Sequence, residues 1–166
     1  GWEGRWARSA ERADAEVALV VLGAWDVFDV EVDGVLIPFG SPESDARFVG
    51  GVNAGIAALR ATGTHVALLE IACMRPQDVD GAGVPALPER GDDARVAHLN
   101  DLLRDIADEH HDVTFVEGPD EWCADEAIST DLSYRWDGVH VHRPGAALVF
   151  GTVATDLLSI PLPPRE

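Results

Sequence analysis

Basic residues are scarce in this sequence, and lysine is absent. The 166 residues include 12 basic side chains, every one an arginine, against 30 Asp and Glu, which gives a formal net charge of −18 at pH 7. Such an excess of negative charge repels phosphate backbones and anionic lipid surfaces. We therefore expect no nucleic-acid partner and no electrostatic attachment to a membrane surface.

Long hydrophobic runs are also missing. The longest, Val17 to Trp25, has nine residues, whereas a membrane-spanning helix needs about 20. No charged-then-apolar leader opens these residues, so neither a span nor a leader is expected here. A composition of 46% hydrophobic and 25% charged residues is that of a globular domain. The length predicts one domain over residues 1–160 and a tail over 161–166.

The sequence also has few cysteines and no nucleotide-binding motif. The only cysteines are Cys73 and Cys123, and their spacing matches neither a zinc site nor a Cys-x-x-Cys redox pair. They fit one disulfide or two buried thiols, and the pattern leaves both open. No Gly-x-Gly-x-x-Gly or phosphate-binding loop follows an expected strand, so the sequence predicts no dinucleotide site and no cofactor.

Hydrophobic periodicity predicts strands alternating with helices. Strands are expected at 17–22, 65–71 and 113–116, helices at 2–13, 41–63, 92–106 and 144–158, and long loops at 72–92 and 117–136. The run at 17–22 is typical of a strand buried on both faces. Asp33-Gly34 between two short apolar runs predicts a type I′ hairpin over 30–37. This order predicts a three-layer α/β/α sandwich around a parallel sheet.

Functional sites of such folds lie beyond the carboxyl ends of the strands. The segments expected there are Gly23-Ala24-Trp25-Asp26, Cys73-Met74-Arg75-Pro76 and residues 137–145. Asp137 lies three residues before His140, a spacing that lets the carboxylate hold one ring nitrogen while the other accepts a proton from a nucleophile. The plainer interpretation is that Asp137 caps a turn and His140 is a surface residue.

Two other interpretations of these residues were weighed. His140 and His142, together with Asp137, have spacing that suits a metal ion, but no further ligand completes the set, and no metal is expected. Trp25, Trp122 and Trp136 lie near the same predicted edge of the sheet, where aromatic faces either stack on a sugar ring or pack the loops.

The final block carries a family resemblance. Asp-Gly-Val-His at 137–140, followed by Arg-Pro-Gly-Ala at 143–146, resembles the last conserved block of the SGNH (GDSL-like) hydrolases. More narrowly, the chain is similar to the extracytoplasmic SGNH domain at the C-terminus of membrane-bound acyltransferase-3 proteins. The matching features run in order from about residue 2 to residue 158. They are Gly-Ala-Trp-Asp-Val-Phe-Asp, the Asp-Gly hairpin, Phe-Gly-Ser-Pro, Cys-x-Arg-Pro, Arg-Val-x-His-Leu-Asn-Asp-Leu-Leu and Asp-Gly-Val-His.

The resemblance implies an SGNH/flavodoxin-like fold and a Ser-His-Asp mechanism. His140 would be the general base and then the general acid, and Asp137 would orient it. The implied reaction moves or hydrolyses an O-acyl group, expected to be acetyl, on a cell-envelope carbohydrate or a small ester. The implied location is outside the cytoplasmic membrane, in a membrane-bound parent protein. Such a compartment permits a disulfide between Cys73 and Cys123.

Two departures from the family pattern shape the expectation. The Gly-Asp-Ser block that carries the nucleophile and the first strand is absent, and Trp25 stands where the family has its oxyanion-hole Asn. A backbone N–H near Gly23 or Ala24 would then serve the oxyanion. Without the first strand, residues 17–22 become a sheet edge that invites pairing. We expect an N-terminal segment or a second chain to pair there.

The nucleophile is therefore expected outside this chain. None of its own serines lies on a strand-to-helix elbow; they are Ser9, Ser41, Ser44, Ser129, Ser133 and Ser159. The alternative function is a catalytically incomplete domain that binds a glycan or a protein partner.

Overall fold

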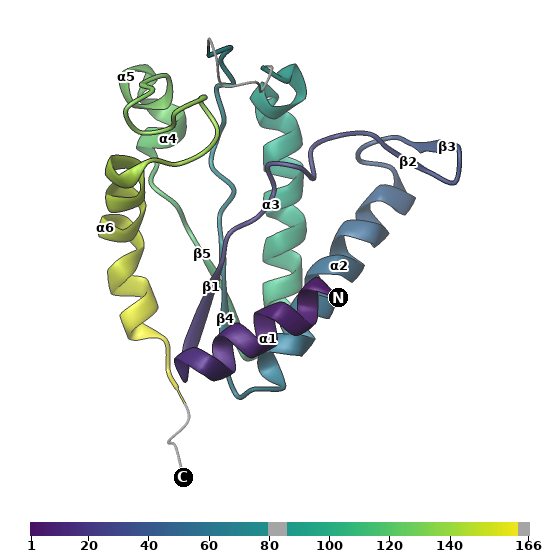
Figure 1. The fold of residues 1–166 in the computed structure, drawn as a ribbon, viewed down its shortest axis with the longest axis vertical. Helices are drawn as coiled ribbons and strands as arrows, with labels where there is room; N and C mark the ends of the chain where they lie inside the picture. The colour runs from purple at the N-terminus through teal and green to yellow at the C-terminus, as the bar shows by residue number, and fades with distance from the viewer. Residues whose placement is uncertain (80–85, 163–166) are drawn as a thin grey trace.

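The protein is a mixed α/β structure with a three-stranded parallel sheet and a separate two-stranded hairpin (Figure 1). The computed structural model describes residues 1–79 and 86–162. In chain order the elements are α1 (Trp2–Ala13), β1 (Val17–Val20), β2 (Val30–Val32), β3 (Val35–Ile37), α2 (Pro42–Arg60), β4 (His65–Leu69), the 3-10 turn η1 (Pro88–Gly91), α3 (Asp93–Asp108), β5 (Val113–Val116), α4 (Glu121–Ala124), α5 (Glu126–Ser129) and α6 (Arg143–Ser159).

Strand β4 is the centre of the sheet. The order is β1-β4-β5 with parallel pairing throughout, and Val66 lies opposite Ala18 on one side and Val113 on the other. Every residue of β4 is buried. This full burial follows from the continuous apolar run, since a central parallel strand is covered on both faces.

Helices cover the two faces of the sheet separately. Val66 and Leu68 of β4 point into the larger core, which α2 and α3 complete with residues such as Leu59 and Leu103. Ala67 and Leu69 point the opposite way, into a smaller core built with α6. Because side chains alternate along a strand, one short segment anchors both cores.

Strand β1 corrects the prediction of a strand at 17–22 buried on both faces. It ends at Val20, and its first three residues are only half-buried. Val21 follows with 68% of its surface exposed. The reason is position: within the described residues β1 pairs with β4 alone, so one edge lacks a neighbouring strand. Strand β4 likewise ends at Leu69 rather than at residue 71.

The turn and helix-start predictions are confirmed at residue level. Asp33 and Gly34 both have positive φ, 51° and 80°, as a type I′ turn requires. The Ser41 hydroxyl accepts the Ser44 N–H at the start of α2. That helix ends at Arg60, three residues before the expected stop at Gly63.

The two predicted long loops contain short helical turns that the periodicity did not indicate. Turn η1 lies in the first, and α4 and α5 lie in the second. Residues 80–85 of the first loop, and residues 163–166 of the predicted tail, lie outside the described residues. Within the described part, no helix has both the length and the apolar character needed to cross a membrane.

A disulfide joins these two loop regions. Cys73 and Cys123 are bonded with an S–S distance of 2.06 Å, across a sequence separation of 50 residues. This confirms the disulfide and excludes the alternative of two buried thiols in this structure. The bond joins the segment after β4 to α4, so it holds together two loop regions beyond the carboxyl ends of the strands.

Removal of this cross-link is expected to lower stability. A bond closing a loop of this length restricts the unfolded chain, and its loss is worth about 3–4 kcal/mol. The double variant Cys73→Ala/Cys123→Ala should lose that amount in urea unfolding. Reduction of the wild type should reproduce the loss, whereas the same reductant should leave the double variant unchanged. Equal stability of oxidised wild type and double variant would contradict this role.

Candidate active site beyond the carboxyl ends of the strands

Asp137 and His140 form a direct pair. His140 Nδ1 lies 2.7 Å from Asp137 Oδ2, and Asp137 Oδ1 accepts the backbone N–H groups of Val139 and His140 at 3.0 and 2.7 Å. The carboxylate is buried, with 4% of its side chain exposed, whereas the imidazole is 42% exposed. One carboxylate therefore caps the turn and holds the ring at once, and the second ring nitrogen, Nε2, is the one left for chemistry.

The environment of Asp137 keeps it ionised. Burial by itself raises the pKa of Asp137, but hydrogen bonds from His140 and Val139 and the charge of His140 outweigh burial, so the pKa lies below its ordinary value. An ionised carboxylate only accepts hydrogen bonds, so Nδ1 of His140 carries the proton. Nε2 of the neutral ring is then an acceptor, as a general base requires.

The turn that carries Asp137 is docked on the segment after β4. Arg75 N–H donates to Gly138 O at 3.0 Å, and Gln77 N–H donates to Asp137 O at 2.9 Å. Gly138 has φ of +76°, and a Cβ there would lie 1.7 Å from Arg75 O. Glycine is thus required both by the backbone angle and by the approach of the neighbouring chain. The predicted second and third segments meet here through backbone contacts.

The first predicted segment, Gly23 to Asp26, divides between two hollows. Ala24 lines a cavity of about 120 Å³ that Met74, Val139 and Val141 also line, which brings it beside the Asp137–His140 turn. Trp25 and Asp26 instead line a separate hollow beside α2. Gly23 itself is a tight turn with φ of +107°, where a Cβ would lie 2.4 Å from Ile71.

Trp25 is a large exposed side chain on a rigid support. Its exposed fraction is 66%, and the guanidinium of Arg90 lies 4.2 Å from its ring centroid. Arg90 is itself buried and donates to Ala24 O at 2.8 Å. Asp26 follows, and burial raises the pKa of Asp26, partly offset by the backbone of Gly23. Trp25 therefore presents an exposed aromatic surface supported by the buried guanidinium of Arg90.

Sequence reasoning missed Arg135. This arginine is 2% exposed and donates to the backbone carbonyls of Cys73 and Ser129. Its guanidinium lies 4.1 Å from the ring centroid of Trp122. Burial, helped by the charge of Arg75 and opposed by Asp137, lowers the pKa of Arg135 to about 10. It remains charged at pH 7 and ties together the loops that carry the site. The only signal in the sequence was its position two residues before Asp137.

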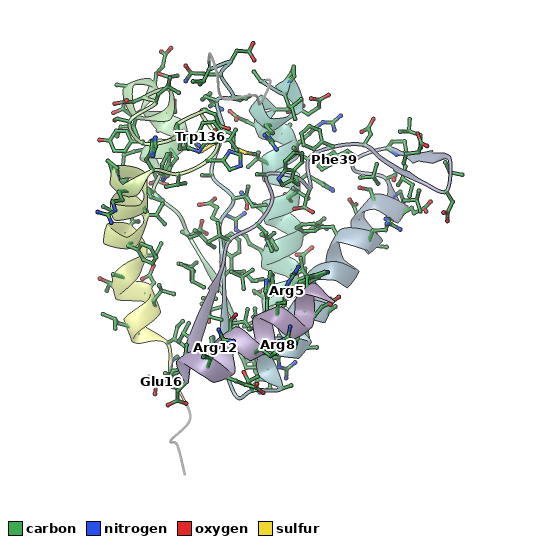
Figure 2. All side chains as sticks on the ribbon, viewed as in Figure 1. Arg5, Arg8, Arg12, Glu16, Phe39 and Trp136 are labelled. Atoms are coloured by element: carbon green, nitrogen blue, oxygen red, sulfur yellow. A yellow bond between two sulfur atoms is a disulfide. The ribbon has the colours of Figure 1, made fainter. Side chains whose placement is uncertain are left out.

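The tryptophans near the site have different roles. Trp122 is 1% exposed and packs the interior, so it offers no free face to a ligand. The Trp136 indole stacks on the His140 imidazole, with 5.3 Å between ring centroids and 14° between planes. Figure 2 shows Trp136 at the end of the molecule to which the strands point.

No serine of the described residues completes a triad. None of their hydroxyl groups hydrogen-bonds with His140, and Ser129, which is buried, donates to Glu126 O instead. Across the described ranges no group of three His, Cys, Asp or Glu side chains gathers to hold a metal ion. His142 is the N-cap of α6, and its backbone N–H donates to Tyr134 O at 2.7 Å.

Comparison with known proteins adds no assignment. No family model matches the chain, and no curated protein matches it. What the site can do therefore follows from its geometry, and the SGNH resemblance stays an expectation.

A methyl group at position 138 is expected to break the turn. Gly138→Ala places Cβ against Arg75 O and imposes an unfavourable positive φ, so it should destabilise the protein by at least about 1–3 kcal/mol. Gly51→Ala, in α2 with open space around its Cβ, is the matched control and should not destabilise. Thermal unfolding of both variants measures the difference. A Gly138→Ala protein as stable as the control would show that the turn is not constrained.

The Asp137 carboxylate is expected to stabilise the fold in a pH-dependent way. Its pKa is lower in the folded state than the ordinary 3.8, so its contribution is complete above that value and disappears as pH falls through the folded pKa. Asp137→Asn should cost about 1–3 kcal/mol near pH 6, because charged hydrogen bonds are lost. The difference between wild type and variant in urea unfolding should shrink towards pH 2. A difference that grows in acid would contradict the assignment.

Proposed function

We propose that this chain is the acid–base part of an SGNH-type esterase or O-acyltransferase whose serine nucleophile comes from outside these residues. The single observation that carries the proposal is the Asp137–His140 pair, with its buried carboxylate and half-exposed imidazole. A buried, ionised carboxylate on Nδ1 is the arrangement that makes Nε2 a general base. The proposed fold is correspondingly the three-layer SGNH sandwich, of which the described sheet forms part of the middle layer.

The chemistry assigned to His140 balances without a cofactor. Nε2 takes the proton as the serine oxygen attacks the acyl carbon, and the tetrahedral oxyanion forms. Nε2 then gives that proton to the leaving alcohol oxygen as the ester C–O bond breaks, leaving an acyl-serine. Water or an acceptor hydroxyl attacks the acyl-serine by the same route, which yields hydrolysis or transfer. Asp137 stays ionised and stabilises the imidazolium in both steps.

The free edge of β1 is where the missing strand is proposed to pair. A groove of about 450 Å³ lies along β1, lined mainly by apolar residues that include Trp6, Ala18 and Val21. Val21 also lines the cavity beside the Asp137–His140 turn. An apolar strand added parallel to β1 would satisfy its open backbone groups and end at the same edge of the sheet as His140. A serine directly after that strand would reach the site.

The exposed apolar surface of helix α6 favours an added unit that consists of a strand followed by a helix. The helix is apolar around much of its circumference, and an outward stripe of Ala147, Phe150, Ala154 and Leu158 is exposed, with Leu158 88% exposed. Residues three or four apart share one face of a helix, so this stripe is continuous. A helix that follows the added strand would cover the stripe. An N-terminal segment of a longer form, or a second chain, is the proposed source.

Substrate and location rest on the resemblance. The proposed substrate is an O-acylated, in particular O-acetylated, carbohydrate of the cell envelope, and a small ester is the simplest surrogate. The proposed place is outside the cytoplasmic membrane, attached to a membrane-bound parent. The Cys73–Cys123 disulfide supports an oxidising compartment, since such bonds are rare in reducing ones.

A second function is favoured by one observation. Trp25 replaces the amide expected of the family and presents an exposed aromatic surface supported by Arg90. An aromatic face of this kind is suited to stacking on a sugar ring. The alternative is therefore a catalytically incomplete domain that binds a glycan or a protein partner.

Labelling with a fluorophosphonate, read by intact mass, tests the catalytic proposal. The 166-residue chain alone should remain unlabelled, because no serine of the described residues contacts His140. A longer native form should gain one label on a serine outside residues 1–166. His140→Ala should slow that labelling by at least about 100-fold, since general-base assistance is worth 10²–10⁴-fold.

The matched control is His142→Ala, which removes an exposed imidazole two residues away and should label at the wild-type rate. Labelling of one of the chain's own serines would contradict the external nucleophile. Failure of the longer form to react, with carbohydrate binding retained, would favour the glycan-binding alternative.

A further inference from the structure

Trp136 and His140 form a stack that the backbone holds in place. The ring centroids are 5.3 Å apart and the planes lie within 14° of parallel. The backbone N–H of Trp136 donates to the backbone O of His140 at 3.0 Å. Arg135 and Val141, the residues that flank this pair, form an antiparallel bridge. The loop is therefore closed on both sides of Gly138, and the two rings are brought face to face by the backbone.

The stack acts on one face of the ring, whereas Asp137 acts on its edge. The carboxylate fixes Nδ1 at 2.7 Å but leaves the imidazole free to tilt about that hydrogen bond. A parallel indole removes this freedom and sets the direction of Nε2. The negative face of the indole also attracts a cation, so it favours imidazolium over neutral imidazole.

The other charges near His140 define the background for this effect. Asp137 is the anion in direct contact. The nearby cations are Arg135 and Arg75. The charge of Asp137 raises the pKa of buried Arg135, and the charge of Arg75 lowers it. His142 and Arg143 follow in the chain at the start of α6. Among the described residues, Trp136 is the one aromatic side chain that stacks on the imidazole face.

We propose that Trp136 is a positioning residue for His140, which fixes the plane of the imidazole and stabilises its protonated form. The role assigned to protonated His140, donation to the leaving alcohol, rests on the proposed function. The effect of the indole on the imidazole does not rest on it, because both rings belong to this chain and the stack is complete without a nucleophile.

Titration of the histidine ring signals by NMR tests the proposal on the 166-residue chain as it is. Trp136→Leu keeps an apolar side chain but removes the π face, and should lower the midpoint of the His140 titration by about half a pH unit. Trp136→Phe keeps a π face and should recover most of the midpoint. His142 is the internal reference and should not move in either variant.

Trp2→Leu is the matched control for loss of an indole. Trp2 packs edge-on against Trp6 in α1, and Figure 1 shows α1 away from the end where α4 and the carboxyl ends of the strands lie. The control should leave the His140 midpoint unchanged. An unchanged midpoint in folded Trp136→Leu would overturn the proposal, and so would equal shifts in the Phe and Leu variants.

A second measurement keeps the size of every side chain nearly unchanged. Replacement of all tryptophans by a fluorinated analogue keeps the shape of the indole while it weakens the negative face. The His140 midpoint should fall while the His142 midpoint stays constant, and no fall would overturn the proposal. If the His140 midpoint falls as expected but the longer form is not labelled, only the proposed function is overturned. If the longer form is labelled but the His140 midpoint does not change, only the role of Trp136 is overturned.

Discussion

The candidate site depends on the docking of one turn against one extended segment. Two backbone hydrogen bonds, from Arg75 and Gln77, hold the turn that carries Asp137. Gly138 permits the contact because a side chain there has no room. The pair of Asp137 and His140 is local in sequence, but its turn is held by residues 60 or more positions earlier.

Two further interactions keep this contact rigid. The disulfide anchors Cys73, at the start of the supporting segment, to α4. Arg135 donates to the carbonyl of the same cysteine and stacks on Trp122. Because buried Arg135 bonds the carbonyls of Cys73 and Ser129 and lies two residues before Asp137, it links the segment after β4 to the loop that carries the site. The result is a buried carboxylate beside a half-exposed imidazole.

The sequence predicted the parts of the structure that are local. The Asp33-Gly34 turn, the start of α2 at Ser41 and the spacing of Asp137 and His140 depend on near neighbours, and all are observed. The short extent of β1 was not predicted, because the burial of an apolar strand depends on which strand lies beside it. Arg135 was missed for the same reason, since its partners come from distant segments.

The long-range support of Asp137 has a consequence for biosynthesis. All three described strands of the sheet precede residue 117, whereas the turn that carries Asp137 needs residues up to about 141, and Val139 of that turn belongs to the larger core. Domains generally fold as units, so the larger core and the turn are expected to become ordered together, after residue 141 has been made. Shorter nascent chains therefore lack the docked Asp137–His140 pair.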